Sequence, residues 1–162
     1  MAGQGVTTHS ESRWEQGGAF EHLADSGVAY RSDALVEGEE GRPLTGPKPM
    51  ELLLGAVGGC TGVDLVSILI KMRVVVRSLR IVVEGERALE HPRVFRRVHI
   101  DYRIATEPHD LRRVRRAVEL STRKYCGASA TLASTGTVTY ALHYGDECIE
   151  GVVPGVTPDA RP

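Results

Sequence analysis

The segment that most constrains the fold of this chain is residues 50–73, MELLLGAVGGCTGVDLVSILIKMR. From Leu52 to Ile70 its only charged side chain is Asp64. Because about 20 apolar residues in a helix suffice to cross a bilayer, a transmembrane span is one interpretation. Three observations favour a soluble core helix instead. They are the charge near the middle, a mean hydropathy below zero for the whole chain and strand-like segments on both sides. We therefore expect a fully buried helix, wrapped by a sheet or by a partner subunit.

Four glycines lie within this predicted helix, at positions 55, 58, 59 and 62. Each glycine costs about 1 kcal/mol relative to alanine in a helix interior. Packing has to offset that cost, so we expect the glycines to mark places where another backbone comes close.

The composition argues against several classes of protein. A length of 162 residues fits one domain, or at most two small ones, and a hydrophobic content of 41% is enough for a core. Twenty basic and 21 acidic residues give a net charge of −1, whereas a nucleic-acid-binding protein usually carries a basic excess. The N-terminus shows no basic stretch followed by an apolar core, so no secretory signal is visible and a cytoplasmic location is expected.

Outside the long helix, the chain alternates between strand and helix patterns. Strand patterns occupy residues 12–31, 74–86, 94–105 and 136–145. The first of these stretches predicts two or three short strands, and the middle two predict a hairpin. Residues 108–125 have the spacing of an amphipathic helix with Asp110 as its N-cap, and residues 126–134 predict a short helix. Helices segregated from antiparallel strands indicate the α+β class.

Two of the three cysteines carry the strongest chemical signal. Cys60 lies in the string GAVGGCTG of the long helix, and Cys126 lies in RKYCGAS at the end of the second helix. A lone buried cysteine is usually an inert, small apolar side chain. Two cysteines on successive helices can meet if the helices pack side by side, and a disulfide then needs Cα atoms about 4.4–6.8 Å apart. The third cysteine, Cys148, is expected to be a bystander.

A thiol pair of this kind suits peroxide chemistry. A thiolate that attacks a peroxide oxygen becomes a sulfenic acid, and a second thiol can condense with it to a disulfide. The attacking thiol needs a nearby cation, but Asp64 lies one helical turn after Cys60 and would oppose ionisation. The cation must therefore come from elsewhere, and Arg13 and Arg31 in the N-terminal strands are the candidates. The scattered histidines form no short-spaced Cys/His pairs, so neither a metal nor a cofactor is expected.

The strings GPKPMELLLGAVGGCTGVDLVSILIKMR and RKYCGASATL together resemble the OsmC/Ohr family of osmotically inducible and organic-hydroperoxide-resistance proteins. The resemblance covers about residues 10–145 and is strongest in the branch with Pro-Met-Glu-Leu before Gly-Gly-Cys. It implies an α+β fold in which antiparallel β-sheets wrap a long buried central helix, within an intertwined homodimer. It also implies one OsmC-like domain over residues 1–150. Residues 151–162 contain three prolines and few apolar residues, so we expect them to form a flexible tail.

The resemblance further implies a cysteine-based peroxidase that reduces small organic hydroperoxides with an external dithiol or lipoyl reductant. Cys60 would be the peroxidatic cysteine and Cys126 the resolving one. In the family an arginine and an acidic residue hold the peroxidatic thiolate, and the candidates here are Arg13 and Glu51. Neither is a clean match to the family pattern. On a continuous helix Glu51 lies half a turn around from Cys60, so it reaches the thiol only if the helix begins after it.

Other interpretations of the cysteines stay open at this point. The same fold can serve as a non-catalytic module that binds small apolar ligands or senses oxidants, with Cys60 largely inert. Both cysteines can also be packing residues. No nucleic acid and no membrane is expected as a partner in any of these cases.

Overall fold

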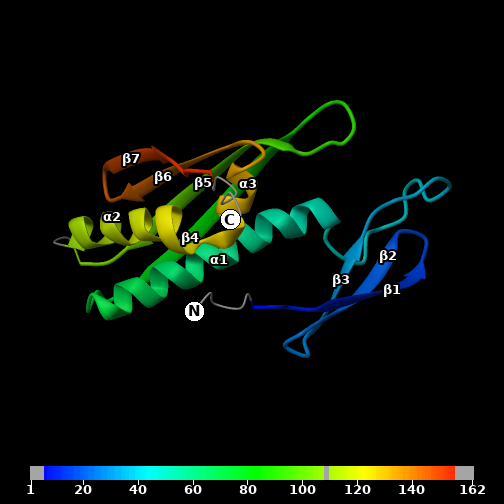
Figure 1. The fold of residues 1–162 in the computed structure, drawn as a ribbon, viewed down its shortest axis with the longest axis horizontal. Helices are drawn as coiled ribbons and strands as arrows, with labels where there is room; N and C mark the ends of the chain where they lie inside the picture. Colours follow the sequence, from blue (N-terminus) through cyan, green and yellow to red (C-terminus); the bar gives the residue numbers. More distant parts are fainter. Residues whose placement is uncertain (1–5, 108–109, 156–162) are drawn as a thin grey trace, which may run out of the picture. The chain divides into compact units, whose positions relative to one another are not determined.

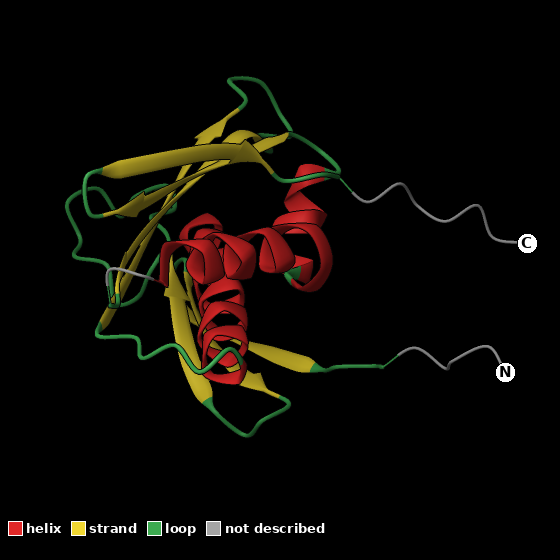
Figure 2. Cartoon of the chain, turned by 90° about the vertical axis from the view of Figure 1, so that its left-hand side faces the viewer, coloured by secondary structure: helices red, strands yellow, loops and turns green. Residues whose placement is uncertain are grey.

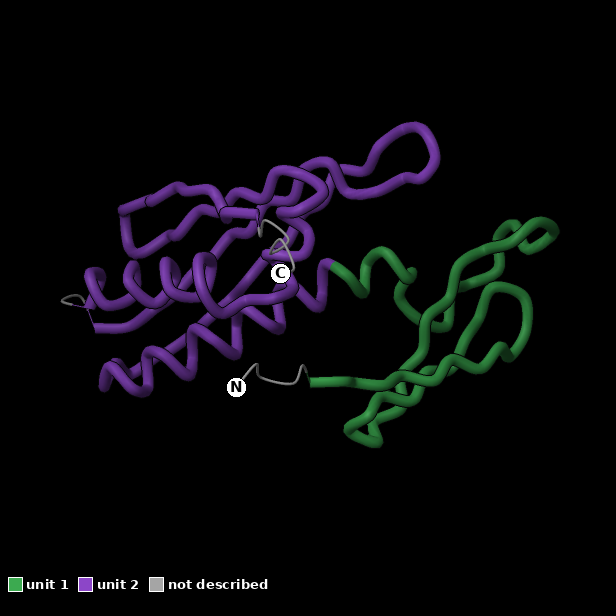
Figure 3. The backbone as a smooth tube through the Cα atoms, in the orientation of Figure 1, with its two compact units in different colours: residues 1–53 green, residues 54–162 purple. Residues whose placement is uncertain are grey.

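The computed structural model describes residues 6–107 and 110–155 of the chain. The chain divides into two compact units, residues 1–53 and residues 54–162 (Figure 3).

The first unit contains a three-stranded antiparallel sheet in the order β1-β2-β3 (Figure 1). The strands are β1 (Ser10–Gln16), β2 (Ala19–Ala24) and β3 (Ala29–Asp33). Gly17 and Gly27, in the two connecting turns, have φ angles of 51° and 80°. Because such positive angles suit glycine, the two turns fall where the sequence predicts breaks between strands. The expectation of two or three short strands over residues 12–31 is confirmed.

An ion pair fastens the loop after β3 to this sheet. Asp33, fully buried at the end of β3, accepts hydrogen bonds from Arg42 Nη1 at 2.7 Å and from Arg42 Nη2 at 2.8 Å. The backbone N–H and the hydroxyl of Thr45 each donate a further bond of 2.9 Å to Asp33 Oδ2. These contacts hold the pKa of the Asp33 carboxyl well below its ordinary range. The hydrogen bonds from Arg42 contribute most, and the Thr45 N–H contributes next.

The second unit contains a four-stranded sheet in the order β4-β5-β6-β7. Its strands are β4 (Ser78–Arg87), β5 (Phe95–Ala105), β6 (Thr137–Tyr144) and β7 (Glu147–Val152). The predicted hairpin is confirmed, because β4 and β5 pair antiparallel. β5 and β6 pair parallel, so this sheet is mixed rather than wholly antiparallel as expected. A parallel pair needs a crossover connection, and helices provide it here.

The crossover from β5 to β6 consists of three successive helical elements. They are α2 (Leu111–Leu120), a π-helical turn called η2 (Ser121–Tyr125) and α3 (Gly127–Ala133). The sequence predicts the amphipathic helix and the short helix but not the π-helical turn between them. The predicted start of the first helix at residue 108 lies outside the described residues. Asp110, predicted as its N-cap, precedes Leu111 and its carboxylate accepts a hydrogen bond from Arg113 at 2.8 Å.

The core of the second unit lies between the sheet and the helices, which Figure 2 shows on one side of the strands. β5 supplies the largest share of this core, because every second residue points inward. The buried residues of β5 are Phe95 and, at every second position, Val98, Ile100, Tyr102 and Ile104. From α2 the buried residues are Val114, Ala117 and Val118, at helical spacing. Together these patterns confirm the predicted α+β class.

The long predicted helix is α1 (Pro49–Lys71). Its buried residues recur every four positions, at Val57, Thr61, Leu65 and Leu69. The other side is open, since Val63 is 72% exposed and Ile70 is 66% exposed. The sheet of one chain therefore covers only one face of the helix. The expectation that a sheet or a partner subunit buries the whole helix stays a prediction for the other face. By length and composition alone, α1 is apolar enough to cross a membrane, a test that core helices of soluble proteins also pass.

The helix glycines do not mark contacts with another backbone of this chain. A Cβ built on Gly62 would lie 3.2 Å from the Ile81 side chain of β4, and one on Gly58 would meet another β4 side chain at 3.5 Å. Gly55 and Gly59 have no heavy atom within 4 Å of such a Cβ. Two of the glycines thus make room for side chains of the sheet, and two lie in open space.

The C-terminal end of the described chain belongs to the sheet. β7 carries Cys148 and runs to Val152, and Val153 behind it is only 2% exposed. The expected tail at residues 151–162 therefore begins with residues of the fold. Residues 156–162 lie outside the described residues.

Candidate functional site

The structure brings together two sulfur atoms that lie far apart in the sequence. The Sγ atoms of Cys60 and Cys126 and a carboxylate oxygen of Asp64 all lie within 4.8 Å of one another. Cys60 and Asp64 share a face of α1 because they are one helical turn apart. Cys126 comes from the junction between η2 and α3. The site is therefore built where α1 passes that junction.

The π-helical turn places the second cysteine. The N–H of Cys126 donates a 2.9 Å hydrogen bond to the carbonyl of Ser121, five residues earlier, as a π-helix requires. Cys126 then serves as the N-cap of α3, where its Sγ accepts the N–H of Ser129 at 3.5 Å. Ser129 Oγ in turn donates to the Cys126 carbonyl at 3.1 Å. The position of Cys126 is thus held by backbone bonds on both sides.

The three cysteines differ in exposure. Cys126 is buried, Cys60 is half-buried and Cys148 is exposed, and all three are free thiols. Burial raises the pKa of the Cys126 thiol, because a buried thiolate loses its hydration, and the neighbouring Cys60 acts in the same direction. The hydrogen bonds from Ser129 act against this rise. Cys60 is accordingly the member of the pair that a solute can meet.

A chain of hydrogen bonds runs from the core to Asp64. Ser121 Oγ donates to Asp64 Oδ2 at 3.0 Å, so the Ser121 oxygen is left to accept from Thr61 Oγ1, 2.8 Å away. Thr61 then accepts from the Tyr102 hydroxyl, also at 2.8 Å. Burial raises the pKa of Tyr102, which keeps this phenol protonated as the first donor. The carboxylate of Asp64 can only accept a hydrogen bond, so Ser121 has to donate to it. Thr61 then donates to Ser121, and Tyr102 donates to Thr61.

The sequence analysis missed most of this network. The sequence indicates Asp64 only as an obstacle to ionisation of Cys60, and it gives no site role to Thr61, Tyr102 or Ser121. A signal was present, because Thr61 and Asp64 are the polar residues next to Cys60 in an otherwise apolar helix. Ser121 likewise continues the apolar spacing of the second helix with a hydroxyl.

A cavity of about 330 Å³ lies against Asp64. Its other lining residues are Ser67, Ile68, Lys71, Met72, Leu120 and Tyr125. Apolar walls with a few polar groups are typical of small-molecule sites. The cavity therefore offers a way for a small solute to approach the Asp64 carboxylate.

A model of the OsmC-like protein family matches residues 38–141, which is more than half of the chain. The chain belongs to the OsmC-like family. Over 131 residues it is 35% identical to Protein YhfA of Escherichia coli K12, an alignment that covers 80% of this chain and 92% of that protein. The predicted family resemblance is confirmed.

Solved structures show the same OsmC-like fold. A hypothetical protein from Aquifex aeolicus VF5 superposes with a TM-score of 0.72 at 26% identity, over 85% of this chain and 96% of that one. The Organic Hydroperoxide Resistance Protein OhrB of Bacillus subtilis superposes with a TM-score of 0.57 at 18% identity, over 85% of this chain and 98% of that one. The second likeness concerns the fold alone. The α+β OsmC-like architecture predicted from the sequence is confirmed.

The remaining predicted site residues of this OsmC-like chain belong to the first unit. Arg13 forms an ion pair with Glu21, and its side chain is 73% exposed. The alternative candidate, Arg31, donates a 2.6 Å hydrogen bond to Glu15. The role of either arginine beside a thiolate stays a prediction.

Glu51 has a structural part in this OsmC-like chain. From the sequence, Glu51 can reach the Cys60 thiol only if the helix begins after Glu51. α1 begins at Pro49, so this condition is not met. Its carboxylate instead accepts the N–H of Lys48 at 2.9 Å, as an acidic residue in the first helical turn often does. Its predicted catalytic role is a matter for experiment.

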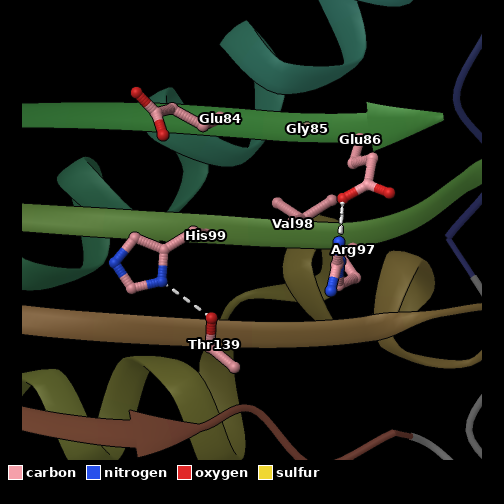
Figure 4. A pocket seen from close by; sticks show the side chains of 7 residues that line it. All are labelled: Glu84, Gly85, Glu86, Arg97, Val98, His99 and Thr139. Atoms are coloured by element: carbon pink, nitrogen blue, oxygen red, sulfur yellow. Dashed lines mark hydrogen bonds and ion pairs between the residues drawn. The ribbon is translucent and has the colours of Figure 1, made fainter.

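A second hollow, of about 460 Å³, lies over β4, β5 and β6 of the OsmC-like sheet. Figure 4 shows the polar side chains of its lining, which come from these three strands. Arg97 Nε donates to Glu86 at 2.8 Å, and His99 Nδ1 lies 2.7 Å from Thr139 Oγ1 (Figure 4). Its lining contains no cysteine, and several of its polar groups already bind one another. The thiol cluster is therefore the stronger candidate site.

Proposed function

We propose that this chain is a thiol-dependent peroxidase that reduces organic hydroperoxides. The observation that carries the proposal is the approach of the Cys60 and Cys126 sulfur atoms to within 4.8 Å. A disulfide has an S–S bond of about 2.05 Å, so the two sulfur atoms have to move closer together before they bond. Membership of the OsmC-like family supports the same reaction class.

Cys60 is the attacking thiol in this proposal, because it is the more accessible of the pair. Its thiolate attacks the terminal oxygen of the hydroperoxide, the O–O bond breaks, and the alkoxide leaves as an alcohol after taking up a proton. Cys60 is thereby oxidised to a sulfenic acid.

Cys126 completes the oxidation. Its sulfur attacks the Cys60 sulfenic sulfur, the S–O bond breaks, and the hydroxyl leaves as water with the thiol proton. An external dithiol, for example a lipoyl group, then reduces the Cys60–Cys126 disulfide and restores both thiols. The burial of Cys126 suits this second role, since the sulfenic acid forms directly beside it.

The proposal requires a positive group near Cys60, because a nearby cation favours the thiolate that attacks the peroxide. The pKa of Cys126 responds to burial, to the hydrogen bonds from Ser129 and to the neighbouring Cys60 thiol. None of these three influences is a cation. Arg13 is the cation that the family implies, with Glu51 as its acidic companion. Both assignments are parts of the proposal, and the variants Arg13→Gln and Glu51→Gln test them.

We also propose that the chain works as a cytoplasmic homodimer whose second copy covers the open face of α1. That face carries a shallow cavity of about 580 Å³ with an apolar lining. Its lining includes Gly59, Gly62, Val63, Val66, Ile70 and Leu79. Light scattering should give twice the chain mass for the wild type, and Val63→Glu should shift the protein toward the monomer. A wild type that is monomeric at high concentration would refute this part.

The decisive experiment follows the consumption of cumene hydroperoxide by the reduced protein in the presence of a dithiol. Cys60→Ser should abolish turnover, whereas Cys148→Ser, which changes an exposed cysteine outside the cluster, should keep it. Equal consumption by the wild type and Cys60→Ser would remove Cys60 from the role. The non-catalytic binding module would then be the better interpretation of the fold.

A further inference from the structure

We propose that Cys60, Asp64 and Cys126 together bind a thiophilic divalent cation, with Zn²⁺ as the best fit, when both cysteines are reduced. The sequence predicts no metal site, because it contains no short-spaced Cys/His pairs. The ligands proposed here are instead one helical turn apart on α1 and far along the chain on the crossover. The site needs free thiols but no peroxide, so it does not depend on the proposed peroxidase activity.

The distances suit one ion. Zn²⁺ binds thiolate sulfur at about 2.3 Å and carboxylate oxygen at about 2.0–2.2 Å in a tetrahedral arrangement. Two sulfurs around one tetrahedral zinc ion therefore lie about 3.8 Å apart, and a sulfur and an oxygen about 3.5 Å apart. The three donor atoms already lie within 4.8 Å of one another. Shifts of about 1 Å or less bring them to an ion between them.

The donor set selects the class of metal. Two sulfurs and one oxygen suit Zn²⁺ and similar borderline cations, whereas Mg²⁺ and Ca²⁺ take oxygen ligands. If both thiols ionised beside Asp64, three negative charges would share a partly buried space. A divalent cation removes that repulsion, because it attracts all three groups at once.

Neighbouring hydrogen bonds already orient two of the three ligands. Ser121 holds one oxygen of Asp64 at 3.0 Å and leaves the other oxygen for a ligand bond. The N–H of Ser129 points at Cys126 Sγ from 3.5 Å, a contact that also stabilises a metal-bound thiolate. Such supporting contacts are typical of metal sites, where they fix the direction of each ligand. The cluster is thus partly organised before any cation arrives.

The fourth coordination position has room. The cavity of about 330 Å³ that Asp64 lines has space for a small ligand on the carboxylate side of the cluster. Three protein ligands plus one exchangeable ligand are characteristic of zinc sites that are not purely structural.

A redox consequence follows, and unlike the site itself it rests on the proposed function. Forming the Cys60–Cys126 disulfide takes two electrons from the two thiolates and removes two of the three metal ligands. The hydroperoxide accepts those electrons with two protons and yields an alcohol and water, and the cation is released. Bound metal and the disulfide therefore exclude each other.

The first test titrates reduced, metal-free protein with Co²⁺ without oxygen and then adds Zn²⁺. We expect one equivalent of tetrahedral cobalt with a thiolate-to-cobalt charge-transfer band, which Zn²⁺ removes. Cys60→Ser and Cys126→Ser should lose the band, and Asp64→Asn should weaken binding by at least 10-fold. Ser121→Ala should weaken binding by about 10–100-fold, as expected for a residue that orients a ligand. Cys148→Ser is the matched control and should bind like the wild type.

A second test uses the wild type alone, so it does not depend on the folding of any variant. Reduced protein is alkylated with iodoacetamide with and without one equivalent of Zn²⁺, and the labelled cysteines are identified by mass spectrometry. Zn²⁺ should slow labelling of Cys60 at least 10-fold and leave Cys148 unchanged. An unchanged rate at Cys60, or a cobalt band that persists in Cys60→Ser, would overturn the proposal. Neither test uses peroxide, so failure of the peroxidase proposal would leave both results interpretable.

Discussion

The Ser121 hydroxyl donates a 3.0 Å hydrogen bond to the carboxylate of Asp64, 57 residues earlier in the chain. This bond joins the π-helical turn to α1 at the level of the two thiols. Behind it, Thr61 and Tyr102 extend the chain of hydrogen bonds into the core. The orientation of Asp64 is thus set by buried residues of the fold rather than by solvent.

The first prediction concerns the far end of that chain. Tyr102→Phe removes the buried hydroxyl that donates to Thr61 and keeps the ring. The free energy of unfolding should fall by about 1–2 kcal/mol, because a buried hydrogen-bond partner is lost. Urea unfolding measures the change. The matched control is Tyr30→Phe in the first sheet, where the side chain is 42% exposed and the change should be below about 0.5 kcal/mol.

The second prediction separates the two thiols of the proposed cycle. After excess hydroperoxide, the wild type should lose two hydrogens as the Cys60–Cys126 disulfide forms. Cys126→Ser should instead gain oxygen at Cys60, because no resolving thiol traps the sulfenic acid before it is oxidised further. Intact-protein and peptide mass spectrometry distinguish these products. A Cys126→Ser protein that gains no oxygen at Cys60 would argue against Cys60 as the attacking thiol.

The third prediction concerns pH and the first unit. Because the pKa of Asp33 is depressed in the folded state, the unfolded chain binds more protons once the pH falls toward about 3.9, the ordinary pKa of an aspartate. The stabilisation by the Asp33–Arg42 pair is fully present above that pH and is lost as the pH falls toward the folded pKa. Melting temperatures between pH 7 and pH 3 should therefore decline on the acid side.

Asp33→Asn tests the assignment. It should lower the melting temperature at pH 7 and flatten the acid decline, since the carboxylate that takes up the proton is gone. Asp25→Asn, in an exposed turn of the same sheet, is the control and should follow the wild type. Parallel acid profiles for the wild type and Asp33→Asn would count against the ion pair as the source of the decline.

The fourth prediction tests packing between the sheet and α1. A Cβ on Gly85 would lie 2.5 Å from the Phe95 ring and 2.9 Å from the Leu54 side chain. Gly85→Ala should thus destabilise the protein by about 1–3 kcal/mol through overpacking. Gly127→Ala is the control, because a Cβ there has no heavy atom within 4 Å. Chemical denaturation of both variants checks the difference, and equal stabilities would contradict the packing described here.

The elements that the sequence predicted well are those with a clear local period. The hairpin of β4 and β5 follows from alternating residues, and α1 follows from a long apolar run with prolines at its start. The two cysteine strings were enough to indicate the family. Each of these signals is contained within a few turns or a single strand.

What the sequence could not predict depends on packing between distant segments. Nothing near Ser121 indicates that its hydroxyl binds Asp64, and the π-helical turn has no known local pattern in this stretch. The sequence also leaves open which face of α1 its own sheet covers, since an apolar helix looks the same whether its own chain or a second copy covers it. Asp64 faces the thiols because it lies one helical turn after Cys60 on α1, which the composition of the helix does not reveal.

The π-helical turn at Ser121–Tyr125 has a consequence for the evolution of the family. It holds one more residue than an α-helical turn would, and Cys126 follows directly. Loss of a single residue there would restore the tighter winding and swing the following position by about 100° around the axis. Relatives that are one residue shorter in this stretch should therefore place a different side chain beside the helix cysteine, whereas relatives of the same length can place a cysteine there.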